Sequence, residues 1–122
     1  MRKFFFDTYA LFELINGNPE YKPYGHQIVI LTTRFNLLEL HYGLLRRRGK
    51  DLADNWFNAF IKYAIDIPDE IFKTASQFRY VHKKRNLSYI DCIGYVLAEA
   101  RGVPFLTGDM QFADLPNVEF VH

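Results

Sequence analysis

Short apolar runs alternate with helical patterns along the whole chain, and this alternation constrains the fold more than any other feature. Strand-like runs occupy residues 3–6, 26–31, 63–67, 104–107 and 118–121. Helical periodicity marks residues 8–15, 33–48, a segment from Asp51 or Asp54 through Ile61, 68–81 and 86–100. Strands that alternate with helices favour an α/β fold with a central, mainly parallel sheet of four or five strands and helices on both faces.

Size and composition predict a single domain over residues 1–122. Hydrophobic residues make up 49% of the chain, so we expect a compact core rather than disorder. The net charge of +1 excludes a bulk electrostatic attraction to nucleic acid and leaves only local basic patches. A lone Cys92 forms no internal disulfide. No apolar run is long enough for a membrane span, and Asp7 ends the first apolar run too early for a signal peptide. We therefore expect a soluble, cytoplasmic protein that does not insert into membranes.

Four acidic residues stand at positions where this fold would gather them. Asp7 directly follows the first strand-like run, and Asp109 follows the fourth after one glycine. Ligands of open α/β sheets bind outside the carboxyl ends of the strands, so both acids belong to the edge where sites form. Asp91 lies in the first turn of the helix at 86–100, and Glu39 lies in the middle of the helix at 33–48. Together they predict one acidic site.

Each of these acids also has a purely structural explanation. Asp7 and Asp109 are suitable N-caps for the segments that follow them. Asp91 stands three residues after Ser88, which is the spacing of a capping box. Glu39 is compatible with a solvated helix face, although no basic residue stands one turn away to pair with it.

As a set, the four carboxylates point to a metal site. Carboxylates gathered at one edge repel one another and have raised pKa values unless cations lie between them. Mg²⁺ and Mn²⁺ accept such oxygen ligands and keep coordination positions for water and phosphate. This donor set suits two-metal hydrolysis of a phosphodiester. The sequence contains no Cys/His grouping with zinc spacing, no glycine-rich phosphate loop and no nucleophile elbow.

Four segments carry a resemblance to a known family. In chain order they read FFFDT at 4–8, NLLELHYGL at 36–44, LSYIDCIGY at 87–95 and FLTGDMQF at 105–112. By these segments the chain resembles PIN domains, and specifically the VapC-type toxin ribonucleases. The resemblance implies a PIN-like three-layer sandwich in which Asp7, Glu39, Asp91 and Asp109 form the acidic quartet.

The same resemblance implies an activity and partners. It implies Mg²⁺- or Mn²⁺-dependent endonucleolytic cleavage of RNA that leaves a 5′-phosphate and a 3′-hydroxyl. It also implies a homodimer and inhibition by a VapB-type antitoxin. The chain departs from many relatives at Gln111, where they carry a further aspartate, so the choice between one and two metal ions stays open.

Several other residues are weaker candidates. Thr8 and Thr107 flank the acids and are candidates to hold a carboxylate or a water, or simply to cap and pack. Two basic clusters are candidates for phosphate contact by RNA, namely Arg46 and Arg47 with their neighbours, and Lys83, Lys84 and Arg85. Both clusters end helices, where the dipole alone favours cations. His41 and His82 are interpreted as surface or packing residues, and Cys92 as a core residue.

Two other functions remain open at this stage. A phosphoacceptor receiver domain also places acids at strand ends, but it requires an acidic neighbour for Asp7 and a lysine after the last strand, and neither is present. A non-catalytic PIN-like module that binds RNA or protein is the second alternative, and Gln111 is the residue that favours it.

Overall fold

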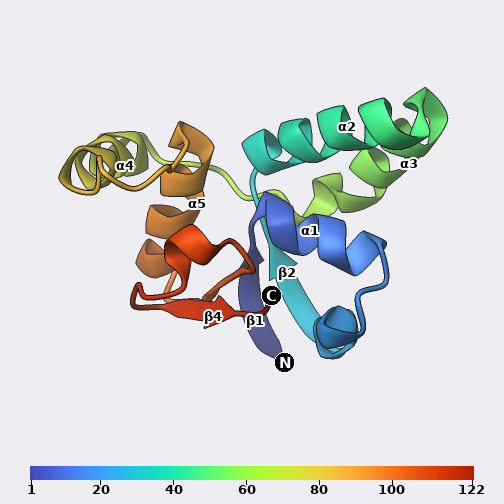
Figure 1. The fold of residues 1–122 in the computed structure, drawn as a ribbon, viewed down its shortest axis with the longest axis horizontal. Coiled ribbons are helices and arrows are strands. Elements are labelled where there is room, and N and C mark those ends of the chain that lie inside the picture. Colours follow the sequence, from blue (N-terminus) through green and yellow to red (C-terminus); the bar gives the residue numbers. More distant parts are fainter.

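The computed structural model describes residues 1–122, which form a three-layer α/β sandwich (Figure 1). The central sheet contains β1 (Arg2–Phe6), β2 (Ile28–Leu31), β3 (Phe105–Thr107) and β4 (Val118–Phe120), in the order β2-β1-β3-β4. All three pairings are parallel. The expected α/β fold is confirmed, with a sheet of four strands that is entirely parallel.

The alternation of side chains along β1 creates two cores, one on each face of the sheet. Phe4 and Phe6 point to one face and Phe5 to the other, and all three are buried. A strand buried on both faces reads as a continuous apolar run, which explains the uninterrupted Phe4-Phe5-Phe6 sequence at the centre of the sheet.

Two groups of helices cover these faces. Helices α1 (Thr8–Ile15), α2 (Arg34–Arg48) and α3 (Lys50–Phe60) pack over Phe4 and Phe6. Helices α4 (Asp69–Val81) and α5 (Tyr89–Ala100) pack over Phe5. Figure 1 shows α4 and α5 on the left and α1 to α3 on the right, with the strands between them.

Three short 3₁₀ segments connect the main elements: Pro19–Tyr24, Ile61–Tyr63 and Met110–Phe112. The last of these, η3, follows β3 and begins directly after Asp109. No helix in the structure is long and apolar enough to cross a lipid bilayer.

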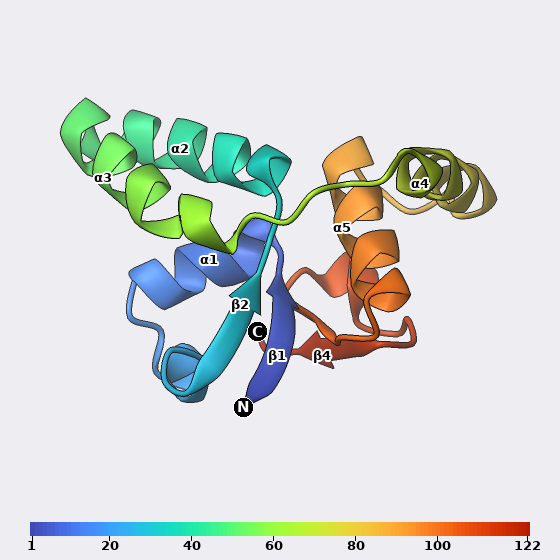
Figure 2. The same ribbon diagram turned by 180° about the vertical axis from the view of Figure 1, so that it is seen from behind.

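The strand expected at residues 63–67 was wrong. Ile61–Tyr63 is a 3₁₀ turn, and the residues after it form a single bridge between Ala64 and Thr32. Thr32 lies just beyond the last residue of β2 and only two residues before α2, so no further strand backbone is available for pairing. The segment instead crosses from α3 to α4 (Figure 2), with Ile65 and Ile67 packed against the α5 core.

The leucines of α2 divide between two faces of the helix. Leu37, Leu40 and Leu44 are buried, whereas Leu38 and Leu45 are 61% and 42% exposed. In a helix the residue next to a buried one is turned by about 100°, so the i+1 position leaves the core. Leu38 and Leu45 therefore belong to an outer apolar face of α2.

Candidate functional site

Asp7 stands at the end of the central strand and is almost fully buried, with 4% of its surface exposed. Its Oδ1 accepts a hydrogen bond of 2.8 Å from the Ala10 amide, which makes it the N-cap of α1. Its Oδ2 accepts from the Thr107 hydroxyl on β3. The structural role proposed for Asp7 is thus confirmed, and it coexists with a position at the carboxyl edge of the sheet.

Asp109 reaches the same edge from β3. Its amide donates a 3.0 Å hydrogen bond to the Thr107 hydroxyl, and its Oδ1 accepts 2.9 Å from the Gln111 amide. Gly108 permits this approach because a Cβ there would lie 2.5 Å from the Val121 carbonyl oxygen and 2.2 Å from the Tyr9 ring. Thr107 therefore links the two acids, since its hydroxyl donates to Asp7 and accepts from Asp109.

Asp91 occupies the first turn of α5 in a complete capping box. Its carboxylate accepts 2.9 Å from the Ser88 amide, while its own amide donates 3.0 Å to the Ser88 hydroxyl. The capping box predicted from the Ser88–Asp91 spacing is confirmed.

Glu39 projects from α2 toward the start of α1. Its Oε1 accepts a 2.6 Å hydrogen bond from the Thr8 hydroxyl, and Thr8 accepts in turn from the Asn36 side chain at 3.1 Å. Glu39 is half-buried, so the alternative of a fully solvated helix face is wrong.

Sequence reasoning missed Asn36 as a member of this network. Asn36 is buried, its side-chain oxygen accepts 2.6 Å from the Thr33 hydroxyl, and its amide nitrogen orients Thr8. The sequence carried a signal, because Thr33 and Asn36 have capping spacing at the start of a helix, and a polar residue there has a structural task.

The electrostatics of these acids show that they influence one another. Burial, together with the charges of Asp91 and Asp109, raises the pKa of Asp7 to about 7, although the hydrogen bonds from Thr107 and Ala10 lower it. Burial, with the charge of Asp91, raises the pKa of Glu39 despite the Thr8 hydrogen bond. Burial and the charge of Asp109 likewise raise the pKa of Asp91, although the Ser88 hydrogen bonds lower it. The four predicted acids therefore share one electrostatic environment.

The donors suit a hard divalent cation, although they are not drawn together into a finished cage. No group of three or more His, Cys, Asp and Glu side chains lies close enough to hold an ion. All four donors are carboxylates, and the six ion pairs of the molecule involve other acids. The charged forms of Asp7, Glu39 and Asp91 are disfavoured by burial, and no cationic side chain pairs with them, so they fit a cation supplied from solution.

The weaker candidates divide into two groups. Thr8 and Thr107 contact site carboxylates directly. The guanidinium groups of Arg46 and Arg47 lie over the rings of Tyr42 and Phe12, at 5.7 and 5.1 Å from the ring centroids. Lys83 and Lys84 are exposed in the connection that leads into α5, whereas Arg85 forms an ion pair with Asp114.

Two residues interpreted as structural have structural surroundings. His41 pairs with Asp54, and Cys92 is fully buried, with its thiol pKa raised to about 11 by burial.

The two pockets of the surface lie away from the acids. The larger, of about 530 Å³, lies between α2 and α3 and is lined by Arg34, Leu38, His41, Asp54, Phe57 and Asn58. The smaller lies between the start of α2 and residues 65–67. None of the four predicted acids lines either pocket.

Comparisons with known proteins bear on the fold of the chain. The sequence profile of the PIN domain matches residues 4–118. A comparison with curated protein sequences finds no match. Among solved structures, DNA-bound VapBC from Salmonella typhimurium superposes with a TM-score of 0.76 at 19% identity, covering 99% of this chain and 98% of that one.

Two further structures are similar over nearly their full length. VapC20 from Mycobacterium tuberculosis, described as a toxin that cleaves the sarcin–ricin loop, has a TM-score of 0.75 at 19% identity, covering 94% of this chain and 98% of that one. VapBC2 from Rickettsia felis, bound to a promoter DNA fragment, has a TM-score of 0.71 at 18% identity, with 98% and 97% covered. At such identities these likenesses establish the shared fold.

Proposed function

The chain belongs to the PIN-domain family, and on that premise we propose that it is a metal-dependent endoribonuclease, the toxin of a VapBC-type pair. The observation that carries the proposal is the electrostatic coupling of four carboxylates, from the end of β1, α2, α5 and the end of β3, none of which forms an ion pair. The family match removes the reason for considering a receiver domain.

Asp7, Asp91 and Asp109 would hold Mg²⁺ or Mn²⁺, directly or through water. Glu39, with Asp91, would complete a second position or orient the attacking water. A divalent cation bound there would lower the pKa of a water ligand and stabilise the negative charge that develops on the phosphate. The raised pKa of Glu39 brings it closer to neutral pH, which suits a group that accepts a proton from water.

The surrounding residues of the chain would prepare the site for this reaction. Thr107 links Asp7 and Asp109 through its hydroxyl. Thr8 donates a hydrogen bond to Glu39, and Asn36 orients Thr8 by donating to it. In-line attack by water on the phosphodiester would leave a 5′-phosphate and a 3′-hydroxyl. None of these side chains needs to form a covalent intermediate.

Basic side chains near the acids would bind the RNA backbone. Lys83 and Lys84 precede Ser88 by only a few residues, so they lie near the end of α5 that carries Asp91. Arg46 lies seven residues beyond Glu39 on α2, roughly 10 Å further along the helix axis. We therefore assign the lysines to phosphates beside the scissile bond and Arg46 and Arg47 to more distant ones.

The partners implied by the resemblance would use the exposed apolar faces. The outer face of α2 carries Phe35, Leu38, Tyr42 and Leu45 at helical spacing beside the larger pocket. An amphipathic segment of a VapB-type antitoxin would fit such a face. Tyr80 and Val81, at the end of α4, and Tyr89, at the start of α5, are also exposed and would serve a homodimer.

The test is cleavage of mixed cellular RNA by the purified protein with Mg²⁺, with Mn²⁺ and with EDTA. We expect metal-dependent cleavage in the wild type and a loss of at least about a hundredfold in Asp91→Asn, because the amide keeps the capping geometry but binds cations weakly. Glu99→Gln is the matched control, since Glu99 is an exposed acid on the same helix.

Any of three results would contradict the proposal. Cleavage that persists in EDTA, or that Asp91→Asn retains in full, would exclude the proposed site. A folded, inhibitor-free protein that neither cleaves RNA nor binds Mn²⁺ in calorimetry would favour the non-catalytic PIN-like module, the alternative that Gln111 suggests.

A further inference from the structure

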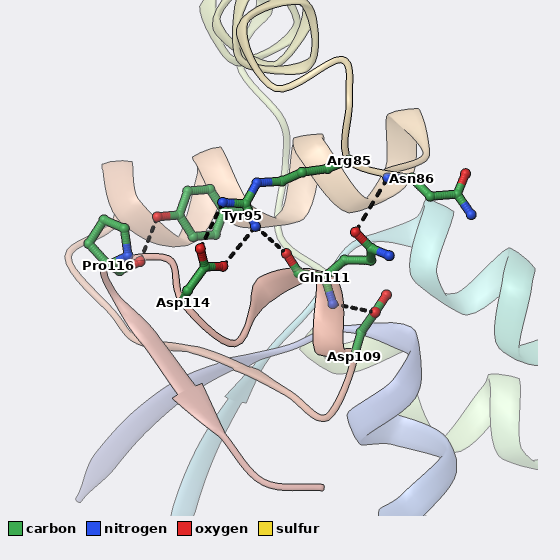
Figure 3. Close-up of polar contacts among 7 residues, drawn as sticks. All are labelled: Arg85, Asn86, Tyr95, Asp109, Gln111, Asp114 and Pro116. Carbon is green, nitrogen blue, oxygen red and sulfur yellow. Dashed lines mark hydrogen bonds and ion pairs between the residues drawn. The ribbon is translucent and has the colours of Figure 1, made fainter.

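Two connections that are distant in the sequence are joined beside the acidic edge (Figure 3). One leads from α4 to α5 and carries Arg85. The other leads from β3 to β4 and contains Asp109, Gln111 and Asp114. Arg85 Nη1 donates 2.7 Å to Asp114 Oδ1 and 2.8 Å to the Gln111 carbonyl oxygen, while Nη2 donates 3.0 Å to Asp114 Oδ2. The guanidinium thus grips both a side chain and the backbone of the β3–β4 connection.

Further hydrogen bonds extend the same junction. The Asn86 amide donates 3.4 Å to the side-chain oxygen of Gln111, and the buried Tyr95 donates its hydroxyl proton to the Pro116 carbonyl. In Figure 3 the Gln111 side chain points toward Asn86, and its backbone amide points toward Asp109. Gln111 therefore connects the α4–α5 connection to the Asp109 carboxylate.

The segment that carries Asp109 needs such external support. Met110–Phe112 is one 3₁₀ turn, and isolated turns of this length are not stable on their own. Phe112 is buried and anchors one side, while Met110 is exposed on the other. The Asp109 charge reaches Asp7 and Asp91, so a rotation of this turn would change the acidic site itself.

A role for Arg85 in direct RNA contact fits these contacts poorly. Three of its hydrogen bonds go to Gln111 and Asp114, and a two-pronged arginine–carboxylate pair is among the stronger side-chain interactions. Lys83 and Lys84, in the same connection, are exposed and take part in none of the ion pairs. The cations of this cluster therefore have different tasks.

We propose that Arg85 is a positioning residue for Asp109: through the Gln111 carbonyl and Asp114 it holds the turn in which the Gln111 amide binds the Asp109 carboxylate. The effect of Arg85 on metal binding rests on the proposed nuclease function. Its effect on the stability of the turn does not, so metal binding and the stability of the turn are measured separately.

The test compares the wild type with Arg85→Gln and Arg85→Lys in two measurements. Hydrogen exchange of the Gln111 amide in metal-free protein reports directly on its bond to Asp109. Calorimetric titration with Mn²⁺ reports on the site. Arg101→Gln is the matched control, because Arg101 is exposed and makes no side-chain hydrogen bond or ion pair.

We expect the Gln111 amide of Arg85→Gln to exchange at least about tenfold faster, and its Mn²⁺ affinity to fall at least about tenfold, while β3 amides keep their protection. Arg85→Lys keeps the charge but not the planar fork, so we expect an intermediate result. It also provides the measurement if Arg85→Gln does not fold. Arg101→Gln should match the wild type.

Unchanged exchange at Gln111 in both Arg85 variants would overturn the proposal. So would faster exchange with unaltered Mn²⁺ affinity in a protein whose wild type binds Mn²⁺, because the turn would then not matter to the site. A wild type that binds no Mn²⁺ would refute the nuclease function. In that case, faster exchange of the Gln111 amide in Arg85→Gln would still support the proposal that Arg85 stabilises the turn Met110–Phe112. Weaker RNA binding with normal exchange and Mn²⁺ affinity would instead assign Arg85 to the substrate.

Discussion

At the scale of single residues, the structural and functional explanations of the acids turn out to be compatible. Asp7 caps α1, Asp91 closes a capping box and Asp109 caps η3, yet all three lie at the edge where the site forms. A carboxylate that caps a helix uses one oxygen or lone pair and keeps others free. The hydrogen bonds that fix these caps would therefore also orient the oxygens toward the proposed cation.

The buried Asp7 should make the metal-free protein less stable as pH rises. Its pKa is about 7 when folded and 3.8 as the reference value, so between these values only the unfolded chain has lost the proton. Unfolding is then favoured by up to about 1.4 kcal/mol per pH unit, and the loss is complete above the folded pKa. The raised pKa values of Glu39 and Asp91 act in the same direction.

The measurement is urea unfolding in EDTA at pH 5 and pH 7.5. We expect the wild type to be more stable at pH 5, and Asp7→Asn to show a clearly smaller difference, because the amide does not titrate. The same pH dependence in both proteins would show that Asp7 is not the responsible group. Asp7→Asn should also abolish RNA cleavage.

At the scale of secondary-structure elements, two glycines allow close approaches that position the site. Gly43 lets α2 approach α1, because a Cβ there would lie 2.3 Å from Cζ of Phe12. Gly108 lets the chain pass between Tyr9 and the Val121 backbone before it reaches Asp109. The atoms that an added Cβ would meet differ between the two sites. At Gly43 they belong to the half-buried Phe12 ring, which can rotate away, whereas at Gly108 they include the Val121 carbonyl of the backbone beyond β4, which cannot.

Gly108→Ala should therefore destabilise the protein more than Gly43→Ala. Overpacking against fixed atoms costs roughly 1–3 kcal/mol, and we expect Gly108→Ala at or above the upper end. In Gly43→Ala, the gain in helix propensity of about 1 kcal/mol offsets part of the clash. Denaturant unfolding of both variants measures the difference in the free energy of unfolding. If Gly43→Ala lost as much stability as Gly108→Ala, or more, the backbone at Val121 would have moved to accommodate the added methyl group.

At the scale of the whole molecule, the parallel sheet determines which residues meet. The order β2-β1-β3-β4 places β1 and β3 side by side, so Asp7 and Asp109 come together although about 100 residues separate them. Helices α2 and α5 cover opposite faces of the sheet (Figures 1 and 2), and the charge of Asp91 on α5 still reaches Glu39 on α2. The basic residues 83–85 precede α5, whose first turn carries Asp91.

RNA binding should depend on salt through Lys83 and Lys84. Each phosphate contact contributes about 0.7 to the slope of log affinity against log salt for single strands. The double variant Lys83→Gln/Lys84→Gln should therefore weaken RNA binding and reduce this slope by roughly 1 to 1.5, with Mn²⁺ affinity unchanged. Binding titrations of inactive Asp91→Asn protein at several salt concentrations measure it. A slope like that of Asp91→Asn alone would exclude both lysines from the interface.

The sequence by itself determined the elements and their caps. Apolar periodicity, Ser88 with Asp91, and the runs before Asp7 and Asp109 act over a few residues, and such local interactions can be recognised without knowing the fold. The same local patterns placed Asp7 and Asp109 at strand ends, Asp91 in the first turn of a helix and Glu39 in the middle of another. What they could not decide was which residues become neighbours across the sheet.

Only the tertiary structure decided those neighbours. Residues 63–67 have strand composition, but the end of β2 leaves them one bridge partner. Leu38 and Leu45 look like core residues until the direction of α2 turns them outward. Asn36 meets Thr8, and Arg85 meets Gln111 and Asp114, across separations of 28, 26 and 29 residues. Such contacts depend on how whole elements pack together, and that packing is a property of the complete chain rather than of any segment.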